Sequence, residues 1–340
     1  MHKFAVAASV CIASMAGLGS AKAQTCTAPE FLNTIVMAPV AGSDLMTVPI
    51  TINGKQKNFL LNTGEPTTQV SQALVRDLGL PESTYMSGTK EFNVKGSHSA
   101  EDVRTRVRVA EFALGTQKGS GFQFLISDDR ELSNSKPYDG LLSNDLFSNY
   151  DVDMDFGSKR LNYFGPNHCA GNVVCWSQRP VAVVPITLMG SKINVPVTVD
   201  GQSVNAVIDT GAARTSMRRD IADVVFHLRA DTPDMMPAGD MRDGRGETIY
   251  SHTFQLLSLE GVTVKNPTIL IQTNSMLRNR DSVSLGSRAQ SAAPRLPDLT
   301  IGMDLLHQLH VYIAFGEKKL YVTAAGTGET EVFKAVAPGR

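Results

Sequence analysis

Polar and apolar residues alternate along two segments that repeat one another at a distance of 147 positions. Residues 48–64 read VPITINGKQKNFLLNTG, and residues 195–211 read VPVTVDGQSVNAVIDTG, with no gap between the two copies. β-Branched residues at every second position, in ITI and in VTV, are typical of a strand with one buried face. Each copy is therefore predicted to begin with a half-buried β-strand.

A turn and a second strand follow in each copy. The turn dipeptides are Asn-Gly at positions 53–54 and Asp-Gly at positions 200–201. Both readily adopt positive φ and favour two-residue hairpins. The chain then returns through NFLL or NAVI to a polar residue followed by Thr-Gly, which is Asn62 in the first copy and Asp209 in the second. The glycine permits a tight turn that presents the polar side chain at the end of the strand.

A second pair of segments also repeats. Residues 138–164 resemble residues 297–322, with Asp145 over Asp304 at an offset of 159 positions. Each of these segments predicts a short helix followed by a hairpin. Because this offset is longer than the first one, we assign the extra residues of the second copy to a polar surface loop at 279–297.

Together the repeats predict an all-β protein of two homologous lobes. The expected boundaries are 30–165 for lobe 1, 166–180 for a linker, 181–325 for lobe 2 and 326–340 for a C-terminal strand or tail. Two further segments predict strands that could pair across the lobes, at 33–40 and 331–337.

The first residues of the chain have a different pattern. A basic residue, Lys3, precedes an apolar stretch from Phe4 to Leu18, and Ala-Lys-Ala at 21–23 fits a signal-peptidase site. The apolar stretch is too short and too rich in Ala and Gly to span a bilayer well. We therefore predict a cleaved signal peptide at 1–23, a periplasmic or secreted protein, and no stable membrane anchor.

Composition and charge narrow the class of partner. Of the 340 residues, 42% are hydrophobic and 19% are charged, and the formal net charge is −1. The charge becomes −3 when Lys3 and Lys22 leave with the signal peptide. These values are typical of a soluble globular protein and argue against nucleic acid as a partner.

Cysteine and histidine spacing gives no sign of a metal or cofactor. Export permits disulfides, and Cys169 and Cys175 are close enough in sequence to be predicted to pair, which would leave Cys26 as a free thiol. A zinc site would need a fourth ligand and tighter spacing. His307 and His310 have H-x-x-H spacing, but no acidic residue lies between them to serve as the base of a metalloprotease. We interpret both histidines as core or surface residues and expect no metal or cofactor.

The two Thr-Gly motifs and their surroundings resemble the retropepsin-like aspartic proteases, in a tandem-duplicated bacterial form. VIDTGA at 207–212 matches the catalytic loop of that family, and LTIGMDLL at 299–306 matches its apolar-Gly segment before a short helix. Lobe 1 departs from the family pattern at two positions. Asn62 replaces the family's Asp, and Ser143 lies where lobe 2 has Gly302. The resemblance covers nearly all of the chain that follows the signal peptide.

This resemblance implies a fold and a site. Each lobe would be a retropepsin-like (acid protease) β-fold with a flap hairpin and one short helix, and a pseudo-twofold axis would relate the two lobes. The flap tips would lie near Gly96 and Gly244. Asp209 and Asn62 would form the catalytic pair. The loop frame around the pair, whose threonines bond across the axis in the family, would consist of Thr63, Gly64, Thr210, Gly211 and Ala212.

Asn62 changes the chemistry that the family implies. Two neighbouring aspartates share a proton, so that one takes a proton from water while the other donates to the scissile carbonyl. A carboxamide can donate an N–H hydrogen bond but cannot hand over a proton. Losing one acid–base partner typically costs about 10²–10⁴-fold in rate, so we predict weak activity. Glu65 is a nearby carboxylate that could replace the lost acid, although its place three residues along the loop favours a solvated loop residue.

Three functions are compatible with these observations. The first, which we predict, is a secreted aspartic endopeptidase that is weak alone or is completed by another carboxylate. The alternative is a pseudoprotease that binds extended peptides in a groove between the lobes by strand addition, without cleavage. The third is a homodimer that pairs Asp209 of two chains. Because a homodimer requires the lobes of one chain to separate, we expect a two-lobed monomer that acts on a peptide or protein substrate.

Overall fold

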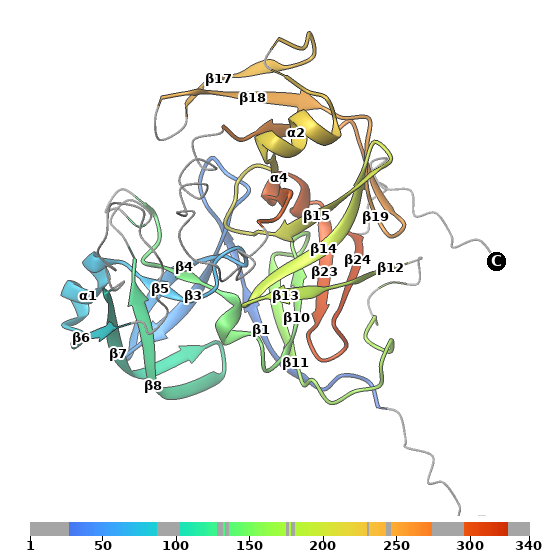
Figure 1. Cartoon of the computed structure of the whole chain (residues 1–340). Helices are drawn as coiled ribbons and strands as arrows, with labels where there is room; N and C mark the ends of the chain where they lie inside the picture. Colours follow the sequence, from blue (N-terminus) through green and yellow to red (C-terminus); the bar gives the residue numbers. More distant parts are fainter. Residues whose placement is uncertain are drawn as a thin grey trace, which may run out of the picture.

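The computed structural model describes residues 27–86, 103–127, 132, 136–174, 177, 181–229, 231–242, 246–273 and 296–325. Within these ranges the chain is nearly all β and forms two lobes, as the sequence predicts. In Figure 1 the main sheet of lobe 1 lies at the lower left, and the outermost strands of lobe 2, β17 and β18, lie at the top.

Lobe 1 is built on an eight-stranded sheet with the order β2-β3-β4-β9-β5-β8-β7-β6. An additional pairing of β3 with β7 curls this sheet towards a barrel. The strand bounds are β2 Ala38–Pro39, β3 Met46–Ile52, β4 Lys55–Leu61, β5 Gln69–Val70, β6 Glu82–Met86, β7 Val103–Leu114, β8 Gln117–Ile126 and β9 Gly140–Leu142. Helix α1 (Gln72–Leu78) follows β5, and the 3-10 helix η1 (Asn144–Leu146) follows β9.

Lobe 2 repeats this plan. Its sheet has the order β17-β18-β21-β16-β22-β15-β14-β19-β20, and β13 pairs with β14. The strand bounds are β13 Thr187–Met189, β14 Lys192–Val199, β15 Gln202–Ile208, β16 Ser216–Met217, β17 Met236–Arg242, β18 Thr248–Thr253, β19 Leu256–Leu259, β20 Val262–Lys265, β21 Thr268–Ile271 and β22 Leu299–Ile301. Helix α2 (Arg219–Val225) follows β16, and α4 (Met303–Leu306) follows β22. The helices η1 and α4 were predicted, whereas α1 and α2 were not.

The predicted hairpins form at the predicted dipeptides. The turn between β3 and β4 has φ values of 47° and 80° at positions 53–54, and the turn between β14 and β15 has 44° and 81° at positions 200–201. Positive φ at both central residues is the geometry that Asn-Gly and Asp-Gly favour. The alternating apolar residues of both copies are buried in the core, as a half-buried strand requires.

A third sheet joins the two lobes. Its order is β1-β11-β10-β23-β24-β12, and in it β10 of lobe 1 pairs antiparallel with β23 of lobe 2. The bounds are β1 Phe31–Val36, β10 Asp151–Asp155, β11 Arg160–Phe164, β12 Ala182–Pro185, β23 Leu309–Ala314 and β24 Lys319–Ala324. These strands lie together at the centre and lower right of Figure 1. The predicted early strand at 33–40 is present as β1 and β2, and β1 is part of this inter-lobe sheet.

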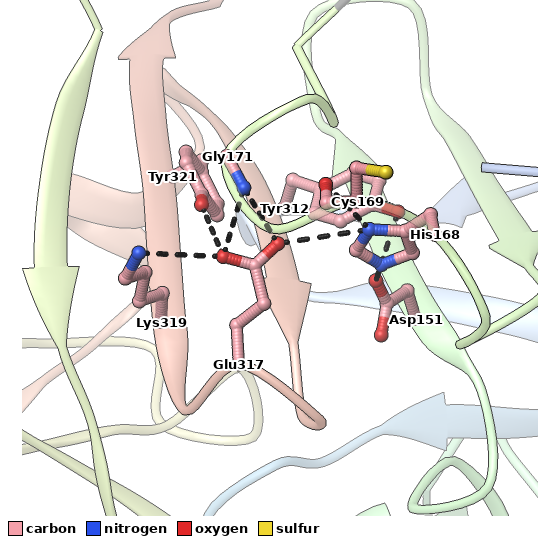
Figure 2. A network of polar contacts seen from close by, with 8 residues as sticks. All are labelled: Asp151, His168, Cys169, Gly171, Tyr312, Glu317, Lys319 and Tyr321. Carbon is pink, nitrogen blue, oxygen red and sulfur yellow. Dashed lines mark hydrogen bonds and ion pairs between the residues drawn. The ribbon is translucent and has the colours of Figure 1, made fainter. Parts of the chain in front are cut away.

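A buried polar network fastens the segment between the lobes to this sheet (Figure 2). His168 Nε2 lies 2.5 Å from Asp151 Oδ2 on β10, and His168 Nδ1 lies 3.7 Å from Glu317 Oε1 between β23 and β24. Tyr312 donates to Asp151 Oδ2 (3.1 Å), and Tyr321 donates to Glu317 Oε2 (2.6 Å). Burial raises the pKa of Asp151, and the bond from His168 opposes that rise. The network therefore joins one linker histidine to carboxylates from both lobes.

A second histidine bridges the lobes directly. His310 on β23 contacts Asp153 on β10, and both side chains are buried. Asn162 donates to the other oxygen of Asp153 at 2.8 Å. His310 is thus a structural residue, as interpreted from the sequence, whereas the side chain of His307 is about one-third exposed and its Nδ1 lies 2.7 Å from the carbonyl oxygen of Met303.

Several predictions fall on residues outside the described ranges. The two flap tips, Gly96 and Gly244, are among them, although the strands on either side of each tip pair as antiparallel hairpins, β6 with β7 and β17 with β18. The signal peptide, most of the loop at 279–297 and the tail at 326–340 are also outside. Among the described helices, none has the length and apolar character needed to cross a bilayer.

The cysteine prediction is tested only at one end. Cys169 is disulfide-bonded, but Cys26 and Cys175 both lie outside the described ranges. The backbone N–H of Cys169 donates to the carbonyl oxygen of Thr27 at 3.3 Å, which makes Cys26 a second candidate partner. The pairing of Cys169 with Cys175 therefore stays a prediction.

Candidate active site

The two polar loops leave equivalent strands of the two lobes. Asn62 follows β4, which pairs in parallel with β9, and Asp209 follows β15, which pairs in parallel with β22. The backbone N–H of Asn62 donates to Leu142 (2.8 Å), and that of Asp209 donates to Ile301 (3.0 Å). These bonds continue each parallel ladder by one residue, so both polar residues are fixed at the ends of their strands.

Each loop holds its polar side chain by one oxygen. Asn62 Oδ1 accepts from the N–H groups of Gly64 (3.1 Å) and Glu65 (3.2 Å). Asp209 Oδ1 accepts from those of Gly211 (2.9 Å) and Ala212 (3.2 Å). Only an oxygen can accept these bonds, which assigns the amide orientation and turns Asn62 Nδ2 away from its own loop. Asn62 therefore offers a fixed N–H donor where Asp209 offers its second carboxylate oxygen.

The side chains and glycines of the two loops pack against each other. A Cβ atom on Gly64 would lie 2.1–2.3 Å from the carboxylate atoms of Asp209, and one on Gly211 would lie 2.3–2.5 Å from the amide atoms of Asn62. No side chain fits at either position without displacing the opposite polar group. The two glycines thus let the loops approach until Asn62 and Asp209 share one site.

Four hydrogen bonds between threonines and backbone lock the loops together. Thr63 donates its hydroxyl to Ile208 O (2.8 Å) and receives the N–H of Thr210 (3.1 Å). Thr210 donates its hydroxyl to Leu61 O (2.9 Å) and receives the N–H of Thr63 (3.0 Å). Both threonines are fully or almost fully buried. The frame predicted from the resemblance is therefore present on both sides of the axis.

Two further carboxylates hold the loops by hydrogen bonds within each lobe. Asp145 accepts the N–H (2.9 Å) and the hydroxyl (2.6 Å) of Thr68, and Asp304 accepts the N–H (2.8 Å) and the hydroxyl (2.6 Å) of Thr215. The sequence repeat identified Asp145 and Asp304 as equivalent positions but did not reveal this role. The arrangement closes each loop on its own lobe, while the frame of Thr63 and Thr210 joins the lobes.

The departure at Ser143 is accommodated within lobe 1. A Cβ atom on Gly302 would lie 2.6 Å from the carbonyl carbon of Arg214 and 2.8 Å from the backbone oxygen of Ala212. Because these are backbone atoms, only glycine fits there. Ser143 lies at the equivalent position of lobe 1 and is fully buried, and its hydroxyl oxygen finds no hydrogen-bond partner within the described ranges. The lobe 1 loop therefore leaves room that the lobe 2 loop does not.

Opposing effects act on the pKa of Asp209. Burial raises the pKa of Asp209, whereas N–H groups of Gly211, Ala212 and Gly64 and the positive charge of Lys192 oppose the rise. Asp209 remains partly exposed, so water can reach it. Because Asn62 carries no charge, the like-charge repulsion that divides two aspartates into an acid and a base is missing. Glu65 is half-buried on the opposite loop.

A cross-lobe contact near the site was not foreseen from the sequence. Ser191, in the turn between β13 and β14 of lobe 2, donates its hydroxyl to Pro66 O (2.6 Å) on the Asn62 loop. Asn144 donates to Ser191 O (2.9 Å) and to Thr63 O (2.9 Å). Little in the sequence points to this contact. Asn144 falls inside the repeated segment 138–164, but the equivalent residue of lobe 2 is the apolar Met303, so the repeat does not mark Asn144 as a polar contact.

Chemically, the site combines one carboxylate, one amide donor and a ring of backbone N–H groups. This set can take a proton from water and hydrogen-bond a carbonyl oxygen. In the part of the chain that the structure describes, no three His, Cys, Asp or Glu side chains gather so as to hold a metal ion.

Comparison with solved structures gives distant likenesses. Basic 7S globulin from soybean has 8% identity and a TM-score of 0.45, covering 91% of this chain and 100% of that chain. Conglutin gamma, a basic 7S globulin from lupine seeds, has 11% identity, a TM-score of 0.46 and the same coverage. The protein edgp has 8% identity and a TM-score of 0.48, covering 87% of this chain and 95% of that chain. Comparison with curated proteins found no match.

A family model gives the decisive comparison. The aspartyl protease model matches residues 48–146 and again residues 195–305, one region in each lobe. Each region contains one of the polar loops, and together they cover more than half of the chain. The chain therefore belongs to the aspartyl protease family, as a tandem of two retropepsin-like lobes.

Proposed function

We propose that the chain is a weak aspartic-type endopeptidase in which Asp209 alone is the base that activates water. The observation that carries this proposal is the complete frame around Asp209. Two N–H groups of its own loop fix one carboxylate oxygen, and the threonine frame docks it against lobe 1. A carboxylate held this way has a second oxygen that the N–H groups of Gly211 and Ala212 do not engage, and a neutral donor, Asn62, lies opposite it. This is half of the acid–base pair that the family uses.

The reaction can be written with these two side chains. Asp209 takes a proton from water as the water oxygen attacks the scissile carbonyl carbon, and the carbonyl π electrons move to its oxygen. Asn62 Nδ2 donates a hydrogen bond to that oxyanion but transfers no proton. Asp209 then passes its proton to the leaving nitrogen as the C–N bond breaks and the carbonyl re-forms. One carboxylate thus serves as base and then as acid.

Asn62 sets the rate and pH dependence of this mechanism. Without proton transfer to the carbonyl oxygen, the rate is expected to be about 10²–10⁴-fold lower than with two carboxylates. Only ionised Asp209 is active, so activity should rise with pH through the pKa of Asp209, which burial raises, and then level off. A pair of aspartates would instead give a bell-shaped profile.

The substrate we propose is an extended peptide or unfolded protein segment that crosses the axis beneath the two flap hairpins. Such a segment would add a strand to the exposed backbone of the flaps. The strand β17 is well placed for this role, since it is an edge strand and most of its residues are exposed. We further propose that the protein acts as a two-lobed monomer after removal of a signal peptide, in the periplasm or outside the cell.

A second candidate is a pseudoprotease that binds peptides without cutting them. The observation that favours it is the site of Asn62, whose oxygen is fully engaged by Gly64 and Glu65 while the frame of threonines stays complete. A protein that only binds peptides needs the contact between the lobes but does not need a carboxylate in lobe 1.

The deciding experiment is digestion of a peptide library by the purified protein, residues 24–340, across about pH 3–7, a range that extends upwards from the ordinary pKa of an aspartate. The Asp209→Ala variant is the control for contaminating peptidases. Slow cleavage that disappears in Asp209→Ala supports the peptidase. Peptide binding with no cleavage in either protein supports the pseudoprotease. Cleavage that persists in Asp209→Ala would exclude the proposed mechanism.

A further inference from the structure

Two residues from different lobes hold the polar loop of lobe 1. Asn144 Nδ2 donates to Thr63 O (2.9 Å) and to Ser191 O (2.9 Å), so both N–H groups of this amide are engaged. Ser191, in the turn between β13 and β14 of lobe 2, donates its hydroxyl to Pro66 O (2.6 Å). Asn144 is almost fully buried. These bonds therefore fix the carbonyl groups at both ends of the segment 63–66, and they cross the boundary between the lobes.

Lobe 2 holds its polar loop with backbone groups of its own. The N–H groups of Met303 and Asp304, on α4, donate to Ala212 O (2.8 Å) and Ala213 O (3.2 Å). A Cβ atom on Gly302 would lie 2.8 Å from Ala212 O, so the glycine lets α4 approach the loop this closely. The hold on the Asp209 loop thus lies within one lobe.

The side-chain donors of lobe 1 are not part of the repeat. Asn144 lies over Met303, and Ser191 lies over Asp44. Neither the thioether of Met303 nor the carboxylate of Asp44 can donate a hydrogen bond. The bonds from Asn144 and Ser191 are therefore particular to the loop whose polar residue is an amide.

The bond to Thr63 O acts on that amide through one peptide group. The carbonyl of Thr63 and the N–H of Gly64 belong to the same planar peptide, in which they point in opposite directions. Holding the oxygen therefore directs the N–H, which donates to Asn62 Oδ1 at 3.1 Å. Hydrogen bonds joined in this way polarise one another. Asn144 is thus connected to the side chain of Asn62 by two hydrogen bonds and one rigid peptide.

The same peptide lies against the other polar group of the site. A Cβ atom on Gly64 would lie 2.1–2.3 Å from the carboxylate atoms of Asp209. A rotation of the Thr63–Gly64 peptide would therefore disturb both the amide and the carboxylate. Its orientation is the shared condition for the geometry of the pair.

We propose that Asn144 and Ser191 are positioning residues, which orient the Thr63–Gly64 peptide and through it the Asn62 amide that stabilises the oxyanion. This inference rests on the proposed function and deepens it. Both residues act through the loop and not on the reacting atoms. Because a hydrogen bond weakens steeply as its angle becomes poorer, the contribution of Asn62 depends on how well this peptide is held.

Hydrogen exchange of the Gly64 N–H, followed by NMR, tests the inference without a substrate. Isotope labelling of threonine carbonyl carbons and glycine nitrogens selects the glycines that follow threonine, and Thr-Gly occurs at 63–64, 210–211 and 327–328. Thr63→Val removes the Gly64 signal from this set and so assigns it.

Asn144→Ala should speed exchange of the Gly64 N–H about fivefold or more, the factor that corresponds to the loss of one hydrogen bond of typical strength. Gly211, the equivalent glycine of lobe 2, should change less. Asn33→Ala is the matched control, because Asn33 is also buried and donates to a carbonyl of lobe 1, Leu114 O, at 2.9 Å.

Three further variants separate positioning from a general loss of stability. Asn144→Met gives lobe 1 the side chain that lobe 2 has at the equivalent position, so it preserves volume and should still speed exchange of Gly64. Ser191→Ala removes the bond to Pro66 alone and should have a smaller effect in the same direction. Ser191→Thr keeps the hydroxyl and should restore slow exchange.

Hydrolysis provides a second readout. Because the bond from Asn62 to the oxyanion strengthens in the transition state, Asn144→Ala should lower kcat by up to about 10²-fold, the cost of misplacing a group by about 1 Å, with little change in KM. An unchanged kcat in an active protein would overturn the inference.

The exchange experiment decides independently of cleavage. If the Gly64 N–H exchanges no faster in Asn144→Ala than in Asn33→Ala, or if Gly211 responds as strongly as Gly64, the inference is wrong even when the protein cleaves peptides. If Gly64 responds as expected but the unmodified protein cleaves nothing, the positioning of the Asn62 amide stands and the peptidase proposal fails.

Discussion

The loop that carries Asn62 and the loop that carries Asp209 are nearly identical in their bonds and different in their chemistry. Each fixes one side-chain oxygen by two backbone N–H groups, and each threonine makes the same pair of bonds across the axis. Yet one side chain can exchange a proton and the other cannot. The comparison teaches that the bonds that dock the lobes and the groups that do chemistry are separable.

The residues that pack around the two loops also differ between the lobes. Lobe 2 needs glycine at position 302 because backbone lies where a side chain would be, whereas lobe 1 accepts Ser143, whose buried hydroxyl has no hydrogen-bond partner among the residues that the structure describes. In lobe 2, Ser191 donates a hydrogen bond to Pro66 of the opposite lobe, whereas Asp44, at the equivalent position of lobe 1, lies 4.0 Å from His307. Lobe 1 therefore makes the same hydrogen bonds across the pseudo-twofold axis as lobe 2, but it has different residues around the catalytic position.

The largest effect is expected from making the two loops chemically alike. Asn62→Asp should raise peptidase activity by at least about 10²-fold, the low end for restoring one acid–base partner. The new carboxylate is nearly isosteric with the amide, and its loop already offers the N–H groups of Gly64 and Glu65. Two close carboxylates would share a proton, so the pH–rate profile should become bell-shaped. The measurement is kcat/KM on the best library peptide across pH.

Two controls make that result interpretable. Asn62→Asp combined with Asp209→Ala should return activity to background, because the single remaining carboxylate then faces a methyl group instead of a hydrogen-bonding partner. A silent Asn62→Asp variant that still binds peptides would mean that lobe 1 has become a binding element. An unmodified protein that already cleaves at the rate of the Asp variant would show that another carboxylate completes the site, with Glu65 the first to replace.

The second largest effect is expected at the residue that packs behind each loop, which is Gly302 in lobe 2 and Ser143 in lobe 1. Gly302→Ser should destabilise the protein by about 3 kcal/mol, the upper end for overpacking, because the added atoms meet the backbone of Arg214 and Ala212. The reciprocal change, Ser143→Gly, should alter the free energy of unfolding by about 1 kcal/mol or less, since the cost of glycine is partly offset by removal of an unpartnered hydroxyl. Urea unfolding of both variants measures this difference. Equal losses would contradict the asymmetry.

Much of this fold could be predicted because its signals are local. The Asn-Gly and Asp-Gly turns, the alternating strands and the polar-Thr-Gly loops all lie within the repeat at 48–64 and 195–211, where adjacent residues determine the geometry. The threonine frame followed from the family resemblance, because Thr63 and Thr210 were present in both copies. The family and the two-lobed organisation were likewise predictable.

What escaped prediction depends on contacts between residues far apart in the chain. The pairing of Asp153 with His310 arises only when β10 and β23 meet in the inter-lobe sheet, and the pairing of Asp151 with His168 arises only when the segment between the lobes packs on that sheet. No local pattern distinguishes these residues from solvated ones. The contact of Ser191 with Pro66 and Asn144 was missed for the same reason, since only the docking of its turn on lobe 1 creates it. The short helices α1 and α2 were missed because they lie outside the two repeated segments, 138–164 and 297–322, from which η1 and α4 were predicted.

A third prediction tests whether Thr63 and Thr210, which make equivalent hydrogen bonds, also contribute equally to the free energy of unfolding. Thr63→Val and Thr210→Val each remove a hydroxyl that donates to one buried carbonyl and accepts one buried N–H. Each should cost about 2 kcal/mol, since one buried donor and one buried acceptor are left unpaired. The two losses should agree within about 0.5 kcal/mol, and the double variant should lose less than their sum, because both threonines belong to one hydrogen-bond network across the axis. A clearly larger loss for one threonine would show that the frame is one-sided.

The smallest effect is the pH dependence of stability that Asp209 brings and Asn62 does not. Because burial raises the pKa of Asp209 in the folded protein, its contribution to stability is fully present below its ordinary pKa and is lost as pH rises through the raised value. Asp209→Asn should therefore gain stability relative to the unmodified protein as pH increases across that window, while Asn62→Asp should lose stability over the same window or one that extends higher. Asp145 has a pKa raised by burial too, so only differences between these variants isolate the site. Urea unfolding at several values between about pH 3 and pH 7 provides the measurement. If Asp209→Asn and the unmodified protein keep a constant difference throughout, Asp209 titrates alike in the folded and unfolded chains, and burial does not outweigh the N–H groups and the positive charge that oppose it.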